Sequence, residues 1–307
     1  MCEADISEMQ MDLGQLLTEQ RNSASSEIDR VPTERMLQII NAEDQKVAVA
    51  VAAAIPQLAA AVDLVAGRAQ KGGRLFYIGA GTSGRLGVLD AAECPPTFSV
   101  PAEMVQGIIA GGETALSKAT EATEDDPAMG RNDLLARGFG KADTLVGIAA
   151  SGRTPYVLGA IAEAKAMGAA TIGISCTPAA ELSQSADIGI ELLVGPEVLT
   201  GSTRMKAGTA TKLALNMLTT GMMIRLGYTY GNLMVNVQPK NEKLVDRAQR
   251  IIADGALVER TKAAELLAAS AGNVKTAIVM GCLGISREAA EGKLREAAGF
   301  IVKALEK

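Results

Sequence analysis

The chain has 307 residues, 48% of them apolar, a formal net charge of −5 and no histidine. An apolar share of this size permits a sizeable buried core, whereas an acidic chain whose aromatic share is only 3% is poorly suited to binding nucleic acid. The absence of histidine excludes Ser-His-Asp triads, Cys-His pairs and His-containing zinc sites, so acid–base chemistry falls to Glu, Asp, Lys, Tyr or Cys.

Residues 1–33 are polar and begin without a basic region followed by an apolar run, so we expect no signal peptide. Pro32 suits the first position of a helix and predicts a helix start there. A second helix is expected over 43–68. The most apolar stretch, 47–62, contains Pro56 and is too short and too weakly hydrophobic for a membrane span, which favours a buried or half-buried helix.

Five short apolar runs predict buried strands, and helical stretches such as 154–167 lie between most of them. Alternation of this kind predicts an α/β fold with a doubly wound parallel sheet. The expected strands are 74–78, 104–109, 144–149, 171–175 and 188–194.

After the last expected strand, the pattern becomes helical. We expect a long helix over 206–226, an extended piece over 233–237, and three or four short amphipathic helices over 241–307. Glycines at four positions are expected to break these short helices: Gly255, Gly272, Gly284 and Gly299. The chain is thus expected to divide into an N-terminal arm with helices (1–64), a central α/β domain (65–228) and a C-terminal helical region (229–307).

The first expected strand leads into a glycine-rich loop, residues 79–84, that matches the GxGxxG pattern of dinucleotide-binding loops. That pattern also requires an acidic residue about 20 residues further on. Here Glu113 comes 29 positions after Gly84, and two prolines interrupt the segment between, so a dinucleotide site is disfavoured. Two interpretations remain. The loop is either a tight turn with capping hydroxyls or an anion site for one phosphate group, formed by Gly81, Thr82 and Ser83.

A second loop of the same kind follows the third expected strand. Ser151, Gly152, Arg153 and Thr154 precede Pro155, which suits the first position of a helix. Open α/β sheets bind ligands at the carboxyl ends of their strands, so we expect the two loops to converge on one crevice. Together they indicate a phosphate site more strongly than each does alone.

Two carboxylates near these loops are candidates for chemistry. Glu93 is expected at the end of the helix that follows the first loop, before the stop at Pro95-Pro96, and Glu124 lies in an acidic run over 121–126. For each, a solvated surface residue is the alternative interpretation. A third hydroxyl-rich segment, residues 200–206, precedes the long helix and offers the cation Lys206.

The four cysteines lack CxxC spacing and fit a reducing compartment, so we expect a cytoplasmic protein. Cys94 and Cys176 are interpreted as small buried apolar groups rather than nucleophiles. The 13 methionines are interpreted as core filler rather than a metal site.

Four segments together resemble the N-acetylmuramic acid 6-phosphate etherases, a family of the sugar isomerase (SIS) fold. They are GAGTSGR (79–85), DAAECPPT (90–97), AASGRTPY (149–156) and TGSTRMKAGT (200–209). The opening TEQRN (18–22) fits the same family, and the tail resembles a small ubiquitin-associated-like helical domain, so the resemblance covers about residues 18–307. The glucokinase regulatory protein is a related SIS family with similar loops that binds phosphosugars without chemistry.

The resemblance implies a carbon–oxygen lyase of amino-sugar metabolism and peptidoglycan recycling, which removes D-lactate from N-acetylmuramic acid 6-phosphate without a cofactor or metal. It also implies a homodimer with its site near the interface, closed by the N-terminal arm of a neighbour, and no nucleic-acid or membrane partner. Glu93 and Glu124 are implied as catalytic residues. The implied substrate-binding residues are Gly81, Thr82, Ser83, Ser151, Arg153, Thr154 and Lys206.

Cleavage of the C3 ether requires both a base and an acid, which two carboxyl groups can supply. An ether at sugar C3 is difficult to cleave because alkoxide is a poor leaving group, but ring opening gives a C1 aldehyde that acidifies the C2 proton. Our hypothesis is that Glu124 removes that proton, while Glu93 protonates the departing lactate and then activates water, with Lys206 stabilising the enolate. An aldose–ketose isomerase on the same fold would need the C2 base alone, and a phosphosugar-binding regulator would need neither carboxylate.

Overall fold

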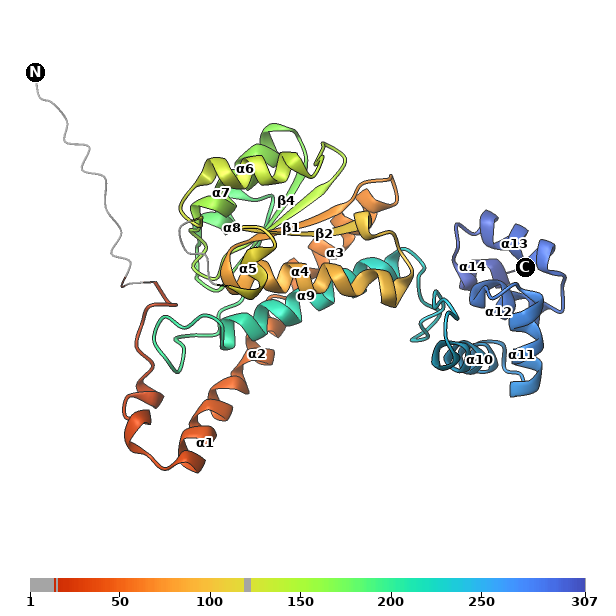
Figure 1. The fold of residues 1–307 in the computed structure, drawn as a ribbon, viewed down its shortest axis with the longest axis horizontal. Coiled ribbons are helices and arrows are strands. Elements are labelled where there is room, and N and C mark those ends of the chain that lie inside the picture. Colours follow the sequence, from red (N-terminus) through yellow and green to blue (C-terminus); the bar gives the residue numbers. More distant parts are fainter. Residues whose placement is uncertain (1–13, 15, 119–122, 307) are drawn as a thin grey trace, which may run out of the picture.

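The computed structural model describes residues 14, 16–118 and 123–306. Its centre is a parallel five-stranded sheet in the order β2-β1-β3-β4-β5, with helices on both faces (Figure 1). The doubly wound α/β fold expected from the sequence is therefore confirmed. Its strands are β1 (Leu75–Gly79), β2 (Val105–Ile109), β3 (Thr144–Ile148), β4 (Ala170–Ser175) and β5 (Ile188–Glu191).

The end of β5 differs from the expected strand over 188–194. Leu192 still donates its backbone N–H to Ser175 O at 2.8 Å, but Val194 N then bonds back to Leu192 O at 2.9 Å. This tight turn takes the chain away from the sheet, and β5 ends at Glu191.

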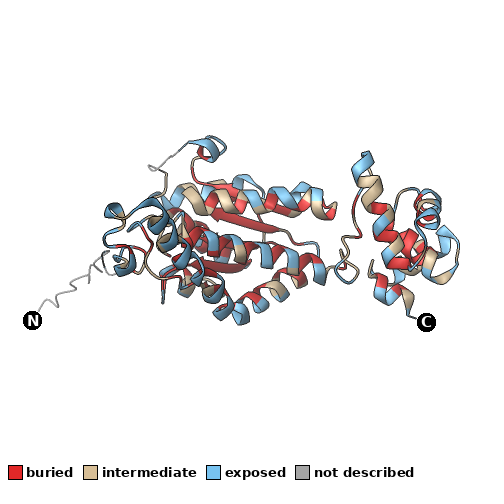
Figure 2. Cartoon of the chain, turned by 90° about the horizontal axis from the view of Figure 1, so that it is seen from below, coloured by how far each residue is buried: buried red, intermediate tan, exposed pale blue. Residues whose placement is uncertain are grey.

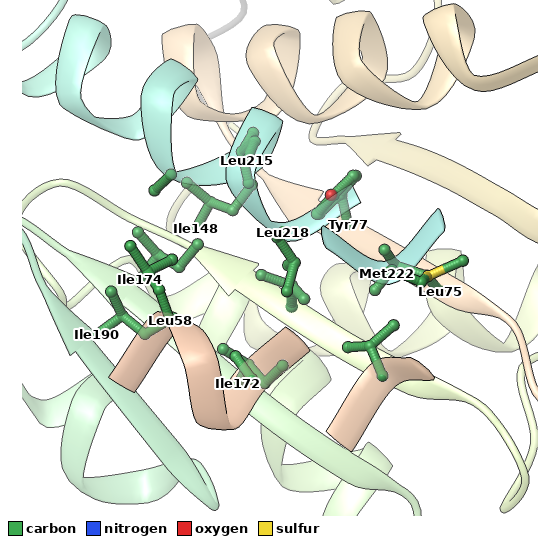
Figure 3. Packing of buried hydrophobic residues seen from close by; sticks show 14 of the residues in the cluster. Leu58, Leu75, Tyr77, Ile148, Ile172, Ile174, Ile190, Leu215, Leu218 and Met222 are labelled. Carbon is green, nitrogen blue, oxygen red and sulfur yellow. The ribbon is translucent and has the colours of Figure 1, made fainter. Parts of the chain in front are cut away.

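One face of the sheet is covered by α2 (Lys46–Ala53), α3 (Ile55–Ala69), α4 (Gly81–Phe98) and α9 (Lys206–Arg225). Figure 3 shows Tyr77, Ile148 and Ile174 of the strands packed against helix residues Leu58 and Leu215. All five are at most 3% exposed. Because full burial of one large aliphatic side chain stabilises a fold by about 1.5–3 kcal/mol, this layer fixes α4 and α9 against the sheet.

The other face is covered by α6 (Pro127–Ala136), α7 (Pro155–Ala166) and α8 (Glu181–Ser185), while the short α5 (Thr114–Ser117) follows β2. Helices α6 and α7 touch through glycines. A Cβ at Gly130 would lie 1.8 Å from Tyr156 O, and one at Gly159 would lie 2.2 Å from Pro127 O. Glycine is therefore required at both positions for the two helices to pack this closely.

The single helix expected over 43–68 is wrong. The chain forms α1 (Thr33–Asp44), then α2, and breaks at Ala54 before α3. The combined segment Thr33–Ala53 is bent by 58° relative to α3. Pro56, the second residue of α3, has no N–H to donate to Ala52, and its ring crowds that carbonyl, so the helix must restart there.

The expected stop of α4 at Pro95-Pro96 is also wrong. The helix continues to Phe98 and ends at Ser99, whose backbone adopts a left-handed conformation (φ 54°). Because the prolines have no backbone N–H, the carbonyls of Ala91 and Ala92 receive no helical hydrogen bond from them. The packing of Cys94 and Phe98 into the core nevertheless stabilises the last turn. Glu93 therefore lies within the helix rather than at its end.

The C-terminal region has five helices in the described residues, rather than three or four, and they form a blue group beside the sheet domain in Figure 1. Gly255 lies inside α10, and the break comes instead at Leu257, which is left-handed (φ 54°). Gly272, Gly284 and Gly299 do separate helices, as expected. The helices are α10 (Glu242–Ala256), α11 (Arg260–Ala269), α12 (Val274–Leu283), α13 (Arg287–Glu296) and α14 (Ile301–Leu305).

These five helices have a core of their own, and Figure 2 shows its buried residues apart from those of the sheet domain. Lys275 ties it to the end of α9 by donating to Gly227 O at 2.7 Å. A boundary near residue 228 remains a proposal that this separate core supports. A boundary at 64 has less support, because Leu58 and Ala61 lie in the core of the sheet domain.

Across the described ranges, no single helix has the length and apolar character that crossing a membrane requires. Two pairs of consecutive segments have the required length and apolar character together, but each pair is strongly bent at its break. They are the α1–α2 segment with α3, and α11 with α12.

Candidate active site

The first glycine loop lies where β1 ends and α4 begins. Gly81 is left-handed (φ 51°), and Thr82 and Ser83 follow it in the first turn of the helix with partly exposed side chains. The backbone N–H groups of such a turn carry partial positive charge and have no partner within the helix. Glu124 lies over this turn: a Cβ at Gly81 would be 3.4 Å from Glu124 Oε1.

The second glycine loop follows the neighbouring strand β3, so both loops lie at the same end of the sheet, where the strand order reverses. Gly152 is left-handed (φ 70°), and Ser151 Oγ accepts a hydrogen bond from Arg153 N at 3.3 Å. Thr154 precedes α7 without capping it through its side chain. The structure thus brings the two loops together, as expected.

Ser151, Arg153 and Thr154 share one pocket of about 550 Å³ with Glu124, and we call it the Glu124 pocket. The guanidinium of Arg153 lies 3.9 Å from Glu181 through Nε, while its Nη1 is buried without a hydrogen-bond partner. A buried N–H donor without an acceptor is costly, so this side chain is suited to receiving an anionic or carbonyl oxygen.

The N-terminal arm of the same chain forms one wall of the Glu124 pocket, through Gly14, Leu16 and Glu19. Two side chains hold the arm to the loop before α9. Asn22 Nδ2 donates to Pro196 O at 3.0 Å, and Ser25 Oγ donates to Val198 O at 2.8 Å. Glu19 was not among the candidate residues, although it lies in the TEQRN segment that fits the family.

Lys206, the expected enolate-stabilising cation, lies outside this pocket's lining. It is 1% exposed, and its Nζ donates to Glu43 Oε2 at 2.6 Å. Burial by itself would raise the pKa of Glu43, but hydrogen bonds from Lys206, Lys46 and Asn22 lower it to about 2. The first backbone N–H groups of α9, those of Lys206 and Ala207, donate to the buried carboxylate of Glu197 at 3.0 and 2.9 Å.

Glu93 lies in a different depression, a groove of about 400 Å³ between α4 and α9 that we call the α4–α9 groove. Glu93 itself is exposed. Apolar walls formed by Leu86, Leu89 and Phe98 line the groove, and Lys212 is the one cation among its lining residues. Beneath it, Cys94 is buried, as expected, and burial raises the pKa of its thiol to about 12.

A chain of polar contacts that the sequence analysis missed runs under this groove. The hydroxyl of the fully buried Tyr77 donates to Asp90 Oδ2 at 2.9 Å. With the Asn216 amide turned to donate to Asp90 Oδ1 at 3.2 Å, its oxygen accepts from Lys212 Nζ at 2.8 Å. Burial raises the pKa of the Asp90 carboxyl, although the bonds from Tyr77 and Thr219 act in the opposite direction. The only sequence signal was Asp90 in the DAAECPPT segment.

The two candidate carboxylates therefore face different depressions of one chain. Glu93 follows Gly81 by 12 positions in α4, which places it about 18 Å along the helix from the first glycine loop. The described residues contain no group of three or more His, Cys, Asp or Glu side chains that could hold a metal ion.

Comparisons with family models agree with this architecture. Residues 57–165 match the model described as the glucokinase regulatory protein N-terminal SIS domain, and residues 133–221 match the SIS domain model. A solved structure of a putative phosphosugar isomerase involved in capsule formation, from Bacteroides fragilis, is similar at a TM-score of 0.48 and 22% identity, covering 63% of this chain and 93% of that one.

Curated relatives match over nearly the whole chain. N-acetylmuramic acid 6-phosphate etherase from Aeromonas hydrophila is 55% identical over 293 residues, covering 95% of this chain and 98% of that protein. The proteins of the same name from Aliivibrio salmonicida and a Synechococcus species are 53% and 54% identical, and the alignments cover 97% and 93% of this chain and 99% and 90% of those proteins.

Proposed function

This chain belongs to the family of N-acetylmuramic acid 6-phosphate etherases, and we propose that Glu93 and Glu124 perform its reaction. It is a lyase that removes D-lactate from C3 of N-acetylmuramic acid 6-phosphate and leaves N-acetylglucosamine 6-phosphate. The observation that carries this conclusion is an identity of 52–55% to relatives of that name over most of the chain.

The phosphate is proposed to bind between the two glycine loops. Backbone N–H groups at the start of α4 and the hydroxyls of Thr82, Ser83, Ser151 and Thr154 offer donors, and Arg153 adds a guanidinium whose buried Nη1 has no acceptor. This anchors the end of the sugar that does not react. The binding energy then holds C2 and C3 of the flexible open-chain form against the carboxylates.

Glu124, beside the first glycine loop, is proposed to take the proton from C2 once ring opening has produced the C1 aldehyde. Glu93 is proposed to give its proton to the ether oxygen as the C3–O bond breaks, so that lactate leaves as a neutral hydroxyl and an unsaturated aldehyde remains. The resulting Glu93 carboxylate then takes a proton from the water that adds at C3, and Glu124 returns its proton to C2, so that both residues regain their starting protonation states. Lys206 is given no role in stabilising the enolate, since its ammonium is buried against Glu43.

The separation of the two carboxylates supports a homodimer whose site combines two chains. Five bonds join the phosphorus to C3 in the substrate, which is roughly 7 Å at bond lengths of about 1.5 Å. Glu93 is about 18 Å along the helix from the first glycine loop of its own chain. A substrate whose phosphate is bound at that loop therefore cannot place its C3 beside Glu93 of the same chain. Leu89, which lines the same groove as Glu93 and is 50% exposed, suits coverage by a second copy.

The phosphorylated substrate also supports a cytoplasmic location. A sugar that carries both a phosphate and a carboxylate does not pass freely through a lipid bilayer, so the enzyme is proposed to work in the compartment where that sugar is held.

The activity is tested by incubating purified protein with N-acetylmuramic acid 6-phosphate in the presence of a chelator and measuring D-lactate. We expect lactate and N-acetylglucosamine 6-phosphate in equal amounts. Binding of the phosphosugar in a calorimeter without lactate release would contradict the proposal and favour a regulator.

Glu93→Gln is expected to lower lactate release by at least about a hundredfold, because general acid catalysis contributes roughly 10²–10⁴-fold. Binding of N-acetylglucosamine 6-phosphate, measured by calorimetry, should remain within about twofold, since the phosphate loops are intact. Glu103→Gln, an exposed glutamate outside both depressions, is the matched control. Full turnover by Glu93→Gln would remove Glu93 from the mechanism.

A further inference from the structure

The α4–α9 groove has a composition that the reaction steps do not use. Beside Glu93 it contains Lys212 as the one cation among its lining residues, an Asp90–Asn216 pair, and walls made by Leu86, Leu89 and Phe98. Acid catalysis needs the glutamate alone. The groove therefore carries a cation and an apolar surface for which the proposed chemistry gives no role.

The side chain of Lys212 is exposed, and a chain of polar contacts leads from it to the buried residues beneath the groove. With the Asn216 amide turned over, its oxygen accepts a hydrogen bond from Lys212 Nζ at 2.8 Å and its nitrogen donates to Asp90 at 3.2 Å. Asp90 is in turn fixed by the hydroxyls of the fully buried Tyr77 at 2.9 Å and of Thr219 at 3.3 Å. A lysine side chain loses rotamer entropy when a ligand fixes it. An anchored chain of contacts like this one reduces the part of that entropy still to be lost when a ligand binds.

The lactyl leaving group carries an anion that could bind to Lys212. The carbon that carries the ether oxygen in the substrate also carries the lactyl carboxylate and a methyl group. When Glu93 reaches the ether oxygen, that carboxylate must lie within a few ångströms of the Glu93 carboxyl group, which becomes an anion once it has given up its proton. Two like charges at such a distance repel unless a cation lies between them.

We propose that the α4–α9 groove is the lactyl subsite, in which the Lys212 ammonium binds the lactyl carboxylate and the walls of Leu86, Leu89 and Phe98 accept the methyl group. This rests on the proposed etherase function. It does not depend on which chain of a dimer supplies the phosphate site, because Glu93 and Lys212 line one groove of the same chain. Lys212 thereby selects the lactyl ether over phosphosugars that lack it.

The test uses full-length protein with Lys212→Met, which keeps an unbranched side chain and removes its ammonium group, and Lys212→Arg, which keeps the charge. A hydrogen bond to a charged group contributes about 1.5–3 kcal/mol, so Lys212→Met should raise KM for N-acetylmuramic acid 6-phosphate roughly 10- to 150-fold. Its Kd for N-acetylglucosamine 6-phosphate should stay within about twofold. Lys212→Arg should recover part of the loss, and Lys243→Met on α10 should change nothing.

A second measurement changes the substrate instead of the protein. When the lactyl carboxylate of the substrate is converted to an amide, kcat/KM of the wild-type enzyme should fall by a similar factor. On that amide, kcat/KM of Lys212→Met should be little lower than kcat/KM of the wild type. Weaker binding of N-acetylglucosamine 6-phosphate by Lys212→Met, a fall in kcat alone, or equal losses on acid and amide would each overturn the subsite. Lactate release by the wild type tests the etherase function separately.

Discussion

The buried pair of Lys206 and Glu43 shows what a single residue contributes to this fold. Glu43 on α1 is 3% exposed and joins α1 to the start of α9. Loss of Glu43 would leave the Lys206 ammonium buried without this carboxylate, and breaking a buried ion pair in this way costs about 3–5 kcal/mol. The pair therefore has a structural role, in which α1 holds the start of α9 and the preceding loop in place.

The pair also predicts a pH dependence of stability. The pKa of Glu43 in the folded chain is about 2, below its ordinary value of 4.5, so the stabilisation is present above pH 4.5 and is lost as the pH falls toward 2. Between pH 5 and pH 3 the free energy of unfolding should fall by about 2 kcal/mol more in the wild type than in Glu43→Gln. Urea unfolding across this range measures it.

The control for that series is Glu34→Gln, an exposed glutamate on the same helix. It should follow the wild-type pH dependence. Parallel curves for the wild type and Glu43→Gln would contradict the role given to this carboxyl.

The sequence predicted residue types at the site better than their contacts. The two glycine loops, with their hydroxyls and Arg153, were all expected, and the structure brings them to one end of the sheet. Lys206 was expected to face substrate, but its partner Glu43 is 163 positions away. No local sequence pattern predicts such a partner, because the burial of Lys206 depends on the tertiary packing of α1 against α9.

At the scale of elements, the strands and long helices followed from the pattern of apolar residues, whereas the effect of each proline did not. Pro56 ends one helix and starts another, but Pro95 and Pro96 lie within α4. The difference is tertiary: the turn after Pro95 is held by Phe98, which is 8% exposed in the core. The local cost of a proline is readable from sequence, but the packing that offsets it is not.

The N-terminal arm is an element whose attachment can be tested. The double variant Asn22→Ala, Ser25→Ala removes the two hydrogen bonds that hold the arm to the loop before α9. At about 0.5–1.5 kcal/mol each, their loss should raise KM for the substrate roughly tenfold, with kcat changed less, because the arm forms a wall of the Glu124 pocket.

Ser26→Ala is the matched control for the arm, since its hydroxyl bonds only to the nearby Ser23 O. It should leave KM as in the wild type. If the double variant behaved in the same way, the arm would have no part in substrate binding.

At the scale of the whole molecule, the distance between Glu93 and the first glycine loop predicts complementation between inactive variants. If each site takes Glu124 from one chain and Glu93 from the other, a heterodimer of Glu93→Gln with Glu124→Gln contains one intact site. Random mixing after unfolding and refolding should then restore about a quarter of wild-type lactate release.

Each variant refolded alone is the control and should stay inactive. A mixture without activity, although chromatography of differently tagged chains shows heterodimers, would mean that each site is built within one chain. The sequence placed Glu93 at the end of the helix that follows the first loop and implied a dimer, but it could not show that Glu93 and Glu124 face different depressions of one chain.

The carboxylate of Glu197 at the start of α9 has a consequence for the choice among cellular sugars. The starts of α4 and α9 are neighbours: a Cβ at Gly208 would lie 3.4 Å from Thr82 Cγ2. A pair of adjacent helix starts could receive the two phosphoryl groups of a diphosphate, but Glu197 already fills the second start with a fixed negative charge. A second phosphoryl group placed at the start of α9 would meet that charge, so this pair of helix starts is suited to a ligand with a single phosphoryl group rather than to a diphosphate.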